Sequence, residues 1–118
     1  MEKLFLLKHN FQDTNVDGTN QLYYCPHCAM IEGLLTYYPN LKNEIEIVHV
    51  NFQRPRNQII ELVGPDNQGC PNLVISKDYS STVDTSYFNE FGDYLFVNKK
   101  ELIAQYLADK YKIGKLHP

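Results

Sequence analysis

The sequence predicts an α/β protein with a four-stranded mixed sheet and the element order β-α-β-α-β-β-α. Short apolar runs of strand type recur along the chain, segments with helical spacing of apolar residues separate the first three runs, and Gly or Pro marks most of the boundaries. The chain has 118 residues, of which 43 % are hydrophobic. We therefore expect residues 1–118 to form a single domain with its own core.

The first third of the chain predicts one strand, one long loop and one helix. Residues 4–8 form a short apolar run that is typical of a buried strand. Residues 9–24 are polar, and a loop of that length without structure of its own is often functional. Helical spacing begins at Cys25 and stops at Pro39, because proline cannot continue a helix.

The middle of the chain predicts a strand, a helix and another strand. Residues 45–50 and 72–76 are rich in Val, Ile and Leu, as strands are. Between them, Arg54-Pro55 opens a second helix, and Gly64-Pro65 ends it. A strand–helix–strand unit at the start of the chain requires a parallel pair of strands joined by a crossover.

The last third predicts a strand and a final helix. Residues 77–93 are polar and rich in turn-forming residues, and residues 94–97 form the fourth strand. Two consecutive strands suggest an antiparallel hairpin on the same sheet. Asn98 and Glu101 have the spacing of a capping box, which predicts a helix from there to about Ile113, with Gly114 just beyond it.

Composition and charge limit the classes of partner. The formal net charge is −3, and no Lys/Arg run is longer than Lys99-Lys100, so we expect no nucleic-acid partner. No apolar run approaches the roughly 20 residues that a membrane helix needs. The N-terminal apolar run is too short for an export signal, so we expect a cytoplasmic protein. Thiols are kept reduced there, and a close Cys pair is then catalytic or metal-binding rather than a structural bridge.

The motif Cys25-Pro26-His27-Cys28 carries the strongest chemical signal, because it lies where a loop becomes a helix. Cys25 is expected at the N-cap, where free amides and the positive end of the helix dipole stabilise a thiolate. Pro26 fits the first helical position, because its missing N–H has no partner there in any case. His27 adds partial positive charge, and Cys28 is placed to attack a mixed disulfide formed on Cys25.

Two other interpretations of these cysteines remain open. Cys25, Cys28 and Cys70 could bind a metal ion or an iron–sulfur cluster, although no second Cys-x-x-Cys pair is present. Alternatively, the cysteines are structural or vestigial, and the domain is a non-catalytic binding protein. Arg54 and Arg56 form either a site for an anionic partner or a solvated helix start.

The element order, the Cys-x-x-Cys helix start and the strand entry Cys70-Pro71-Asn72 resemble the thioredoxin/glutaredoxin superfamily, and the end of the chain is similar to the N-terminal domain of glutathione transferases. More narrowly, the chain resembles DUF3088, a family of small bacterial thioredoxin-like proteins without an assigned function. The segments that carry this resemblance are Leu6-Leu7-Lys8, Tyr24-Cys25-Pro26-His27-Cys28, Ile31-Glu32-Gly33-Leu34-Leu35, Arg54-Pro55-Arg56 and His117-Pro118.

The superfamily resemblance implies roles for individual residues. Cys25 matches the attacking cysteine and Cys28 the resolving one. Pro71 matches a cis-proline opposite the dithiol, so we expect a cis bond between Cys70 and Pro71. Cys70 then lies close to Cys25, and Cys70, Pro71 and Tyr24 are expected to border the substrate groove.

The implied activity is that of a thiol–disulfide oxidoreductase whose partner is a protein or small-molecule thiol or disulfide. This cycle requires no dissociable cofactor. Glutathione is a further candidate, but the acidic residue and Ser that usually anchor it in glutathione transferases are replaced by Lys99 and Lys100. Nothing in the sequence indicates an oligomeric state.

Overall fold

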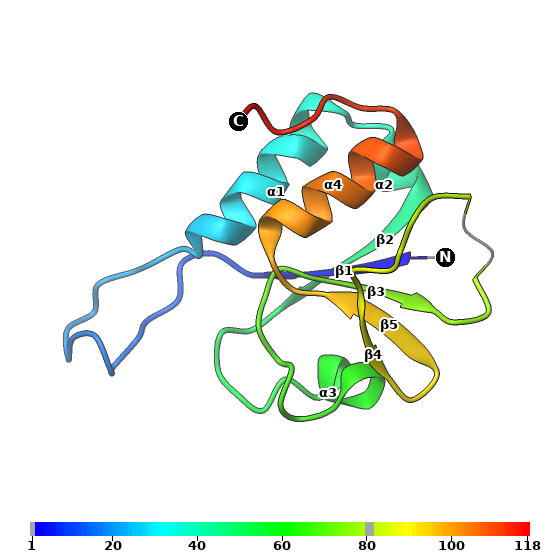
Figure 1. The fold of residues 1–118 in the computed structure, drawn as a ribbon. Coiled ribbons are helices and arrows are strands. Elements are labelled where there is room, and N and C mark those ends of the chain that lie inside the picture. Colours follow the sequence, from blue (N-terminus) through cyan, green and yellow to red (C-terminus); the bar gives the residue numbers. More distant parts are fainter. Residues whose placement is uncertain (1, 80–81) are drawn as a thin grey trace.

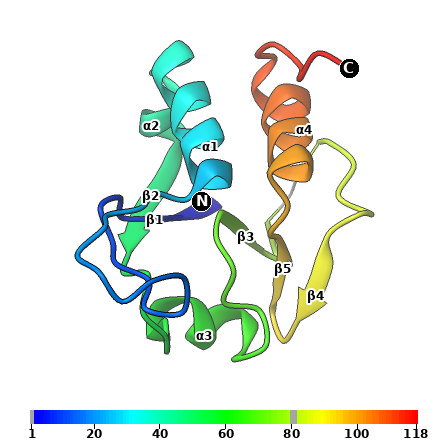
Figure 2. The ribbon, with the colours of Figure 1, turned by 90° about the vertical axis from the view of Figure 1, so that its left-hand side faces the viewer.

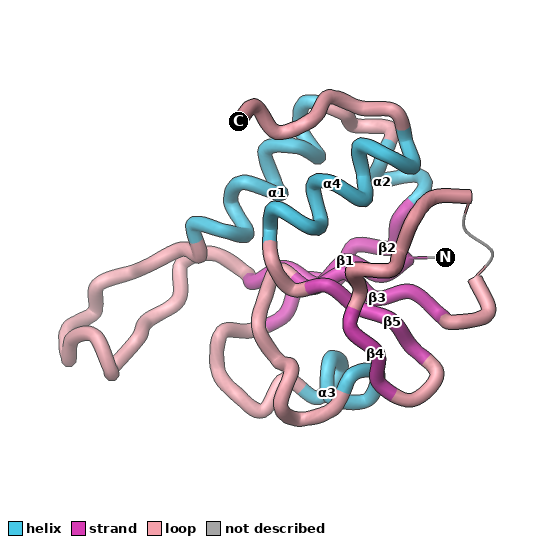
Figure 3. Tube along the Cα trace, viewed as in Figure 1, coloured by secondary structure: helices cyan, strands magenta, loops and turns pink. Residues whose placement is uncertain are grey.

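Apolar side chains on both faces of the strands require helices on both sides of the sheet, and the computed structural model has this arrangement (Figure 1). It describes residues 2–79 and 82–118; Ser80 and Ser81, within the polar stretch 77–93, lie outside the described residues. Helices and strands alternate along most of the chain (Figure 3). In chain order the elements are β1 (Glu2–Leu7), α1 (Pro26–Tyr37), α2 (Leu41–Glu44), β2 (Ile45–Val50), α3 (Asn57–Val63), β3 (Asn72–Ser76), β4 (Asn89–Phe91), β5 (Tyr94–Val97) and α4 (Lys100–Tyr111).

The sheet is open and mixed, with the strand order β2-β1-β3-β5-β4. As expected from the strand–helix–strand unit, β1 and β2 are parallel, and β3 and β5 are antiparallel. The expectation of four strands is wrong, because the described residues form a five-stranded sheet. The additional strand, β4, pairs with β5 at the sheet edge. All three of its residues are exposed, so they show no inward–outward alternation from which a strand could be predicted.

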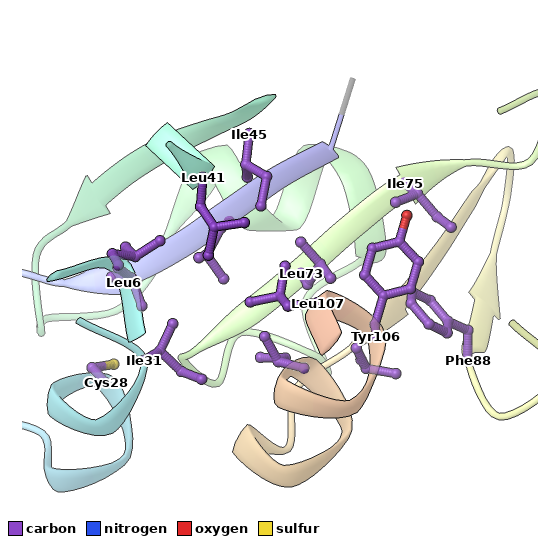
Figure 4. Close-up of a cluster of buried hydrophobic side chains, with 14 residues drawn as sticks. Leu6, Cys28, Ile31, Leu41, Ile45, Leu73, Ile75, Phe88, Tyr106 and Leu107 are labelled. Atoms are coloured by element: carbon purple, nitrogen blue, oxygen red, sulfur yellow. The ribbon is translucent and has the colours of Figure 1, made fainter. Parts of the chain in front are cut away.

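Two hydrophobic clusters lie on opposite faces of the sheet. Helices α1 and α4 lie side by side over one face, and α3 lies on the other (Figure 2). The larger cluster joins Leu6 and Leu73 of the strands to Ile31 of α1 and Leu107 of α4 (Figure 4). The smaller cluster packs α3 against the opposite face. Alternate residues of β1, β2, β3 and β5 therefore point into different clusters, and this part of the sheet is covered on both faces.

The helix boundaries confirm some local rules and contradict others. Helix α1 begins after Cys25, as expected. Helix α3 begins at Asn57, later than Arg54-Pro55 suggested, and α2 was not expected. The capping-box prediction is wrong: Lys99 is the N-cap of α4 and makes no side-chain cap. The left-handed residue after α4 is Lys112 rather than Gly114.

Among the described residues, no helix combines the length and apolarity needed to cross a membrane.

Gly64 ends α3 in a backbone conformation that only glycine adopts without strain. Its φ is +84°, and a Cβ atom there would lie 2.7 Å from the ring of Phe91 in β4. Replacing Gly64 by Ala forces the ring to move and leaves a strained backbone. We expect Gly64→Ala to lower the free energy of unfolding by about 1–3 kcal/mol, measured by urea denaturation.

Gly33→Ala is the matched control for this change. Gly33 lies inside α1, and nothing lies within 4 Å of the position of its Cβ. The same chemical change should there stabilise the protein by about 0.5–1 kcal/mol, because Ala favours a helix interior over Gly. Equal effects at the two positions would show that the close approach of Phe91 to Gly64 is unimportant.

Candidate dithiol site

The site begins at the exposed N-terminus of α1, where the long loop 9–24 returns to the body of the protein. An isolated bridge between Phe11 and Tyr23 closes this loop, and Figure 1 shows the loop extending away from the sheet. Cys25 follows as the N-cap of α1, and Pro26 is at the start of the helix. The Cys25 Sγ accepts a hydrogen bond of 3.2 Å from the backbone N–H of Cys28. The predicted placement of Cys25 and Pro26 is therefore confirmed.

Cys28 lies behind Cys25 and belongs to the larger hydrophobic cluster (Figure 4). Its side chain is only 3 % exposed. The backbone N–H of Leu7 lies 3.5 Å from its Sγ and donates to it. Burial raises the pKa of the Cys28 thiol far above its ordinary value, and the negative charge that Cys25 can carry adds to this effect. Cys28 is thus a protonated, enclosed thiol next to the partly exposed thiol of Cys25.

The turn before β3 provides the opposite side of the site. Strands β1 and β3 are neighbours, so the turn that enters β3 reaches the start of α1. The bond between Cys70 and Pro71 is cis, as expected, and so is the bond between Arg54 and Pro55, which was not expected. The Cys25 Sγ lies 3.9 Å from the carbonyl oxygen of Cys70. Cys70 and Cys25 are therefore neighbours in space, although 45 positions separate them in the sequence.

The thiol of Cys70 is half-buried between the two hydrophobic clusters. Burial raises its pKa to about 11, and the positive charge of Arg56 counteracts part of that rise. At neutral pH, Cys70 and Cys28 are therefore both protonated.

A cavity of about 160 Å³ lies next to His27 of the Cys25–Cys28 motif, between the start of α1, the cis-proline turn and the start of α4, and neither Cys25 nor Cys28 lines it. It brings together three residues expected at the site, His27, Cys70 and Pro71, with Lys99 and Lys100. Lys100 pairs with Glu101 at 2.7 Å. Tyr24 is 65 % exposed and does not line this cavity. The full lining is His27, Cys70, Pro71, Asn98, Lys99, Lys100 and Glu101.

The metal-binding interpretation requires at least three ligands that converge on one point. In residues 2–79 and 82–118, no three His, Cys, Asp or Glu side chains are arranged to hold a metal ion. Cys25, Cys28 and Cys70 lie in one region, but their geometry gives the three-thiolate site no support.

Arg56 is a residue of this region whose position the sequence did not reveal. One interpretation placed it at a solvated helix start, which is wrong, because the side chain is only 8 % exposed. Its guanidinium donates to the backbone carbonyls of Phe52 and Gln68. No local pattern signals this burial, since arginine is almost always exposed unless it is paired.

Together, the fold and the site define an α/β protein that presents a dithiol at a helix N-terminus, beside a cis-proline turn. The chain belongs to the DUF3088 family, described as a protein of unknown function, whose model matches residues 1–115. No curated protein matches the chain, and no solved structure does.

Proposed function

We propose that this protein is a thioredoxin-like thiol–disulfide oxidoreductase. The supporting observation is the arrangement of its dithiol: Cys25 caps an exposed helix start, Cys28 is enclosed one turn behind it, and the Cys70-Pro71 turn lies opposite. The sheet order also fits this superfamily, if β4 is taken as an addition at the edge. Fold alone does not imply function, so the proposal depends on the dithiol.

In the first step, the Cys25 thiolate attacks one sulfur of a partner disulfide. A bond forms between Cys25 and that sulfur, the partner's S–S bond breaks, and the other partner sulfur leaves as a thiolate. The amide of Cys28 and the N-terminus of α1 stabilise Cys25 in its charged form. Partial exposure of Cys25 gives the partner access.

In the second step, Cys28 attacks the Cys25 sulfur of the mixed disulfide. The bond between Cys25 and the partner sulfur breaks, and that sulfur leaves and takes up the proton that Cys28 loses. The protein then holds a Cys25–Cys28 disulfide, and two electrons have passed to the partner, which becomes a dithiol. The reverse sequence oxidises a partner dithiol, so the same residues serve both directions.

The partner in this proposal is a protein or small-molecule thiol or disulfide, and the cycle requires no dissociable cofactor. Cys70, Pro71 and His27 border the cavity into which a partner would reach. We place the protein in the cytoplasm, where other thiol couples can reset the dithiol. Glutathione is a suitable probe because the cavity also borders Lys99 and Lys100.

Cys28→Ser should stop the reaction at the mixed disulfide between Cys25 and the partner. Treated with oxidised glutathione, this variant is expected to accumulate one glutathione on Cys25, because the resolving thiol is gone. The wild-type protein should instead form the Cys25–Cys28 disulfide and retain no glutathione. Intact-protein mass spectrometry followed by peptide mapping distinguishes the two products.

Two further variants are the controls. Cys25→Ser should form neither product, and Cys70→Ser should behave like the wild type. Insulin reduction by the wild type, driven by dithiothreitol, should fall to the uncatalysed rate in Cys25→Ser. If the wild type forms no Cys25–Cys28 disulfide and reduces no insulin, the oxidoreductase assignment fails. Metal analysis and an absorbance spectrum of the isolated protein then test the metal-binding alternative.

A further inference from the structure

Arg56 is a buried positive charge held in a fixed position. Its Nη1 donates to the carbonyl of Gln68 at 2.8 Å, and its Nε donates to the carbonyl of Phe52 at 3.2 Å. The guanidinium also lies 5.7 Å from the centre of the Phe52 ring. That ring stacks on Phe11, from the loop that leads to Cys25, with 4.3 Å between ring centres. These contacts fix the charge between the loop 9–24, through Phe52 and Phe11, and the turn before β3, through Gln68.

Among the described residues, no acidic side chain balances this charge. None of the ion pairs within residues 2–79 and 82–118 includes Arg56. A buried charge without a partner is costly, and proteins rarely keep one. The partners of its hydrogen bonds are neutral carbonyls, so an anion near Arg56 would be stabilised.

Arg56 and the Cys70 thiol share an acceptor, and Cys70 in turn neighbours Cys25. The Cys70 thiol lies 4.0 Å from the same Gln68 carbonyl that accepts from Arg56, and the Cys70 carbonyl lies 3.9 Å from the Cys25 Sγ. Arg56 would attract a negative charge on any of these cysteines, most strongly on Cys70 and least strongly on Cys25. Cys28 and Cys70 stay protonated at neutral pH because both are buried, so Cys25 is the thiol that can carry the compensating charge.

We infer that Arg56 is a positioning residue whose fixed charge stabilises the dithiol form of the Cys25–Cys28 pair over its disulfide form. This inference rests on the proposed oxidoreductase function and adds the preferred direction of electron transfer, from the partner to the protein. When Cys25 of the reduced protein is ionised, its negative charge is attracted to Arg56. In the neutral disulfide, that negative charge is lost and Arg56 has no counter-charge.

The consequence is an oxidising couple. A partner thiolate attacks the Cys25 sulfur, the Cys25–Cys28 bond breaks, and Cys28 leaves and takes up a proton. The second partner thiol gives up its proton and attacks the partner sulfur bonded to Cys25, so that this mixed disulfide breaks and two electrons have passed from the partner dithiol to the protein. The partner becomes a disulfide, and Cys25 is released as a thiolate beside Arg56. A dithiol–disulfide pair whose reduced form is stabilised has a higher reduction potential. Arg56 therefore favours partners that are dithiols.

The other charged groups at the site are His27, Lys99, Lys100 and Glu101, which line the cavity at the start of α4. They do not substitute for Arg56, because Lys100 is paired with Glu101 and both His27 and Lys99 are exposed to water. Arg54 carries the same charge as Arg56 and lies two residues away, but it is exposed. Water and salt screen an exposed charge, so Arg54 provides a matched control.

The test is the equilibrium between the dithiol and disulfide forms of the protein in mixtures of reduced and oxidised glutathione. Free thiols are alkylated, and mass spectrometry then gives the fraction of each form. For Arg56→Gln, we expect the equilibrium constant for reduction of the Cys25–Cys28 disulfide to fall about threefold to tenfold below the wild type. Arg54→Gln should stay within about twofold. Arg56→Lys keeps the positive charge but loses the planar guanidinium group with its several N–H donors. Its equilibrium constant should also stay near that of the wild type.

The comparison of Gln and Lys separates charge from packing. If folded Arg56→Gln matches the wild type, or if Arg56→Lys shifts as far as Arg56→Gln, the inference is overturned. Should Arg56→Gln not fold, Arg56→Lys decides: a threefold fall in its equilibrium constant overturns the inference, and an unchanged constant supports it. A wild-type protein that forms no Cys25–Cys28 disulfide would instead refute the proposed function itself.

Discussion

In the folded, reduced protein, iodoacetamide is expected to label Cys25 at least roughly a hundredfold faster than Cys28 or Cys70 at neutral pH. Alkylation requires a thiolate and access to it. Cys28 is 3 % exposed. The pKa of Cys70 is raised by burial to about 11, which leaves roughly one molecule in ten thousand as the Cys70 thiolate at neutral pH. Cys25 has the hydrogen bond from the Cys28 amide, the helix N-terminus and partial exposure.

Time-resolved labelling followed by peptide mass spectrometry gives the three rates in one experiment. In denaturant the rates should converge, because burial and the helix no longer distinguish the cysteines, and this serves as the internal control. Labelling of Cys28 as fast as Cys25 in the folded protein would contradict the enclosed position of Cys28. Labelling of Cys70 as fast as Cys25 would identify Cys70 as the reactive thiol of the site.

The residues of the dithiol could be predicted from the sequence because their signals are local. A proline directly after Cys25 marks a helix start, and the loop before it ends there. The cis bond before Pro71 is expected because the strand entry Cys70-Pro71-Asn72 resembles that of the thioredoxin/glutaredoxin superfamily, and the structure confirms this bond. Such signals depend on the backbone of a few neighbouring residues, so tertiary context does not erase them.

Arg56 and β4 could not be predicted, because their surroundings arise from contacts in the folded protein that no residue pattern marks. Arg56 is buried where the backbone carbonyls of Gln68 and Phe52 accept its hydrogen bonds. Nothing in the sequence marks either residue as a partner of Arg56. Strand β4 exists through its pairing with β5 across the turn at Gly92. The expected capping box is wrong because Lys99, and not Asn98, is the N-cap of α4, and the Lys99 side chain cannot act as an acceptor.

Far from the dithiol, a buried carboxylate joins the beginning of the chain to its end. Glu2 in β1 is 1 % exposed. Tyr106 and Lys110 of α4 donate hydrogen bonds of 2.8 Å to its Oε2, and Tyr111 donates to both of its oxygens. Glu2 thus fixes the C-terminal helix to the first strand of the sheet, through contacts more than 100 positions apart in sequence.

Replacing Glu2 by Gln should lower the free energy of unfolding by about 3 kcal/mol at neutral pH. The change leaves the charge of Lys110, which is only 16 % exposed, without its partner, and breaking a partly buried pair in this way is costly. Urea denaturation followed by circular dichroism measures the loss. The matched control is Glu46→Gln, because Glu46 pairs with Lys3 on the surface, where such a pair contributes about 0–1 kcal/mol.

The same carboxylate should make stability depend on pH in a predictable direction. Burial alone would raise the pKa of Glu2, but hydrogen bonds from Lys110, Tyr111 and Tyr106 outweigh it and hold this pKa below its ordinary value of 4.5. A group whose pKa is lowered by folding stabilises the protein fully above the unfolded value, and the contribution is lost as pH falls through the folded value. The wild type should therefore lose its advantage over Glu2→Gln as the pH falls below about 4.5. A difference in unfolding free energy that stays constant from neutral to acid pH would show that Glu2 acts through packing alone.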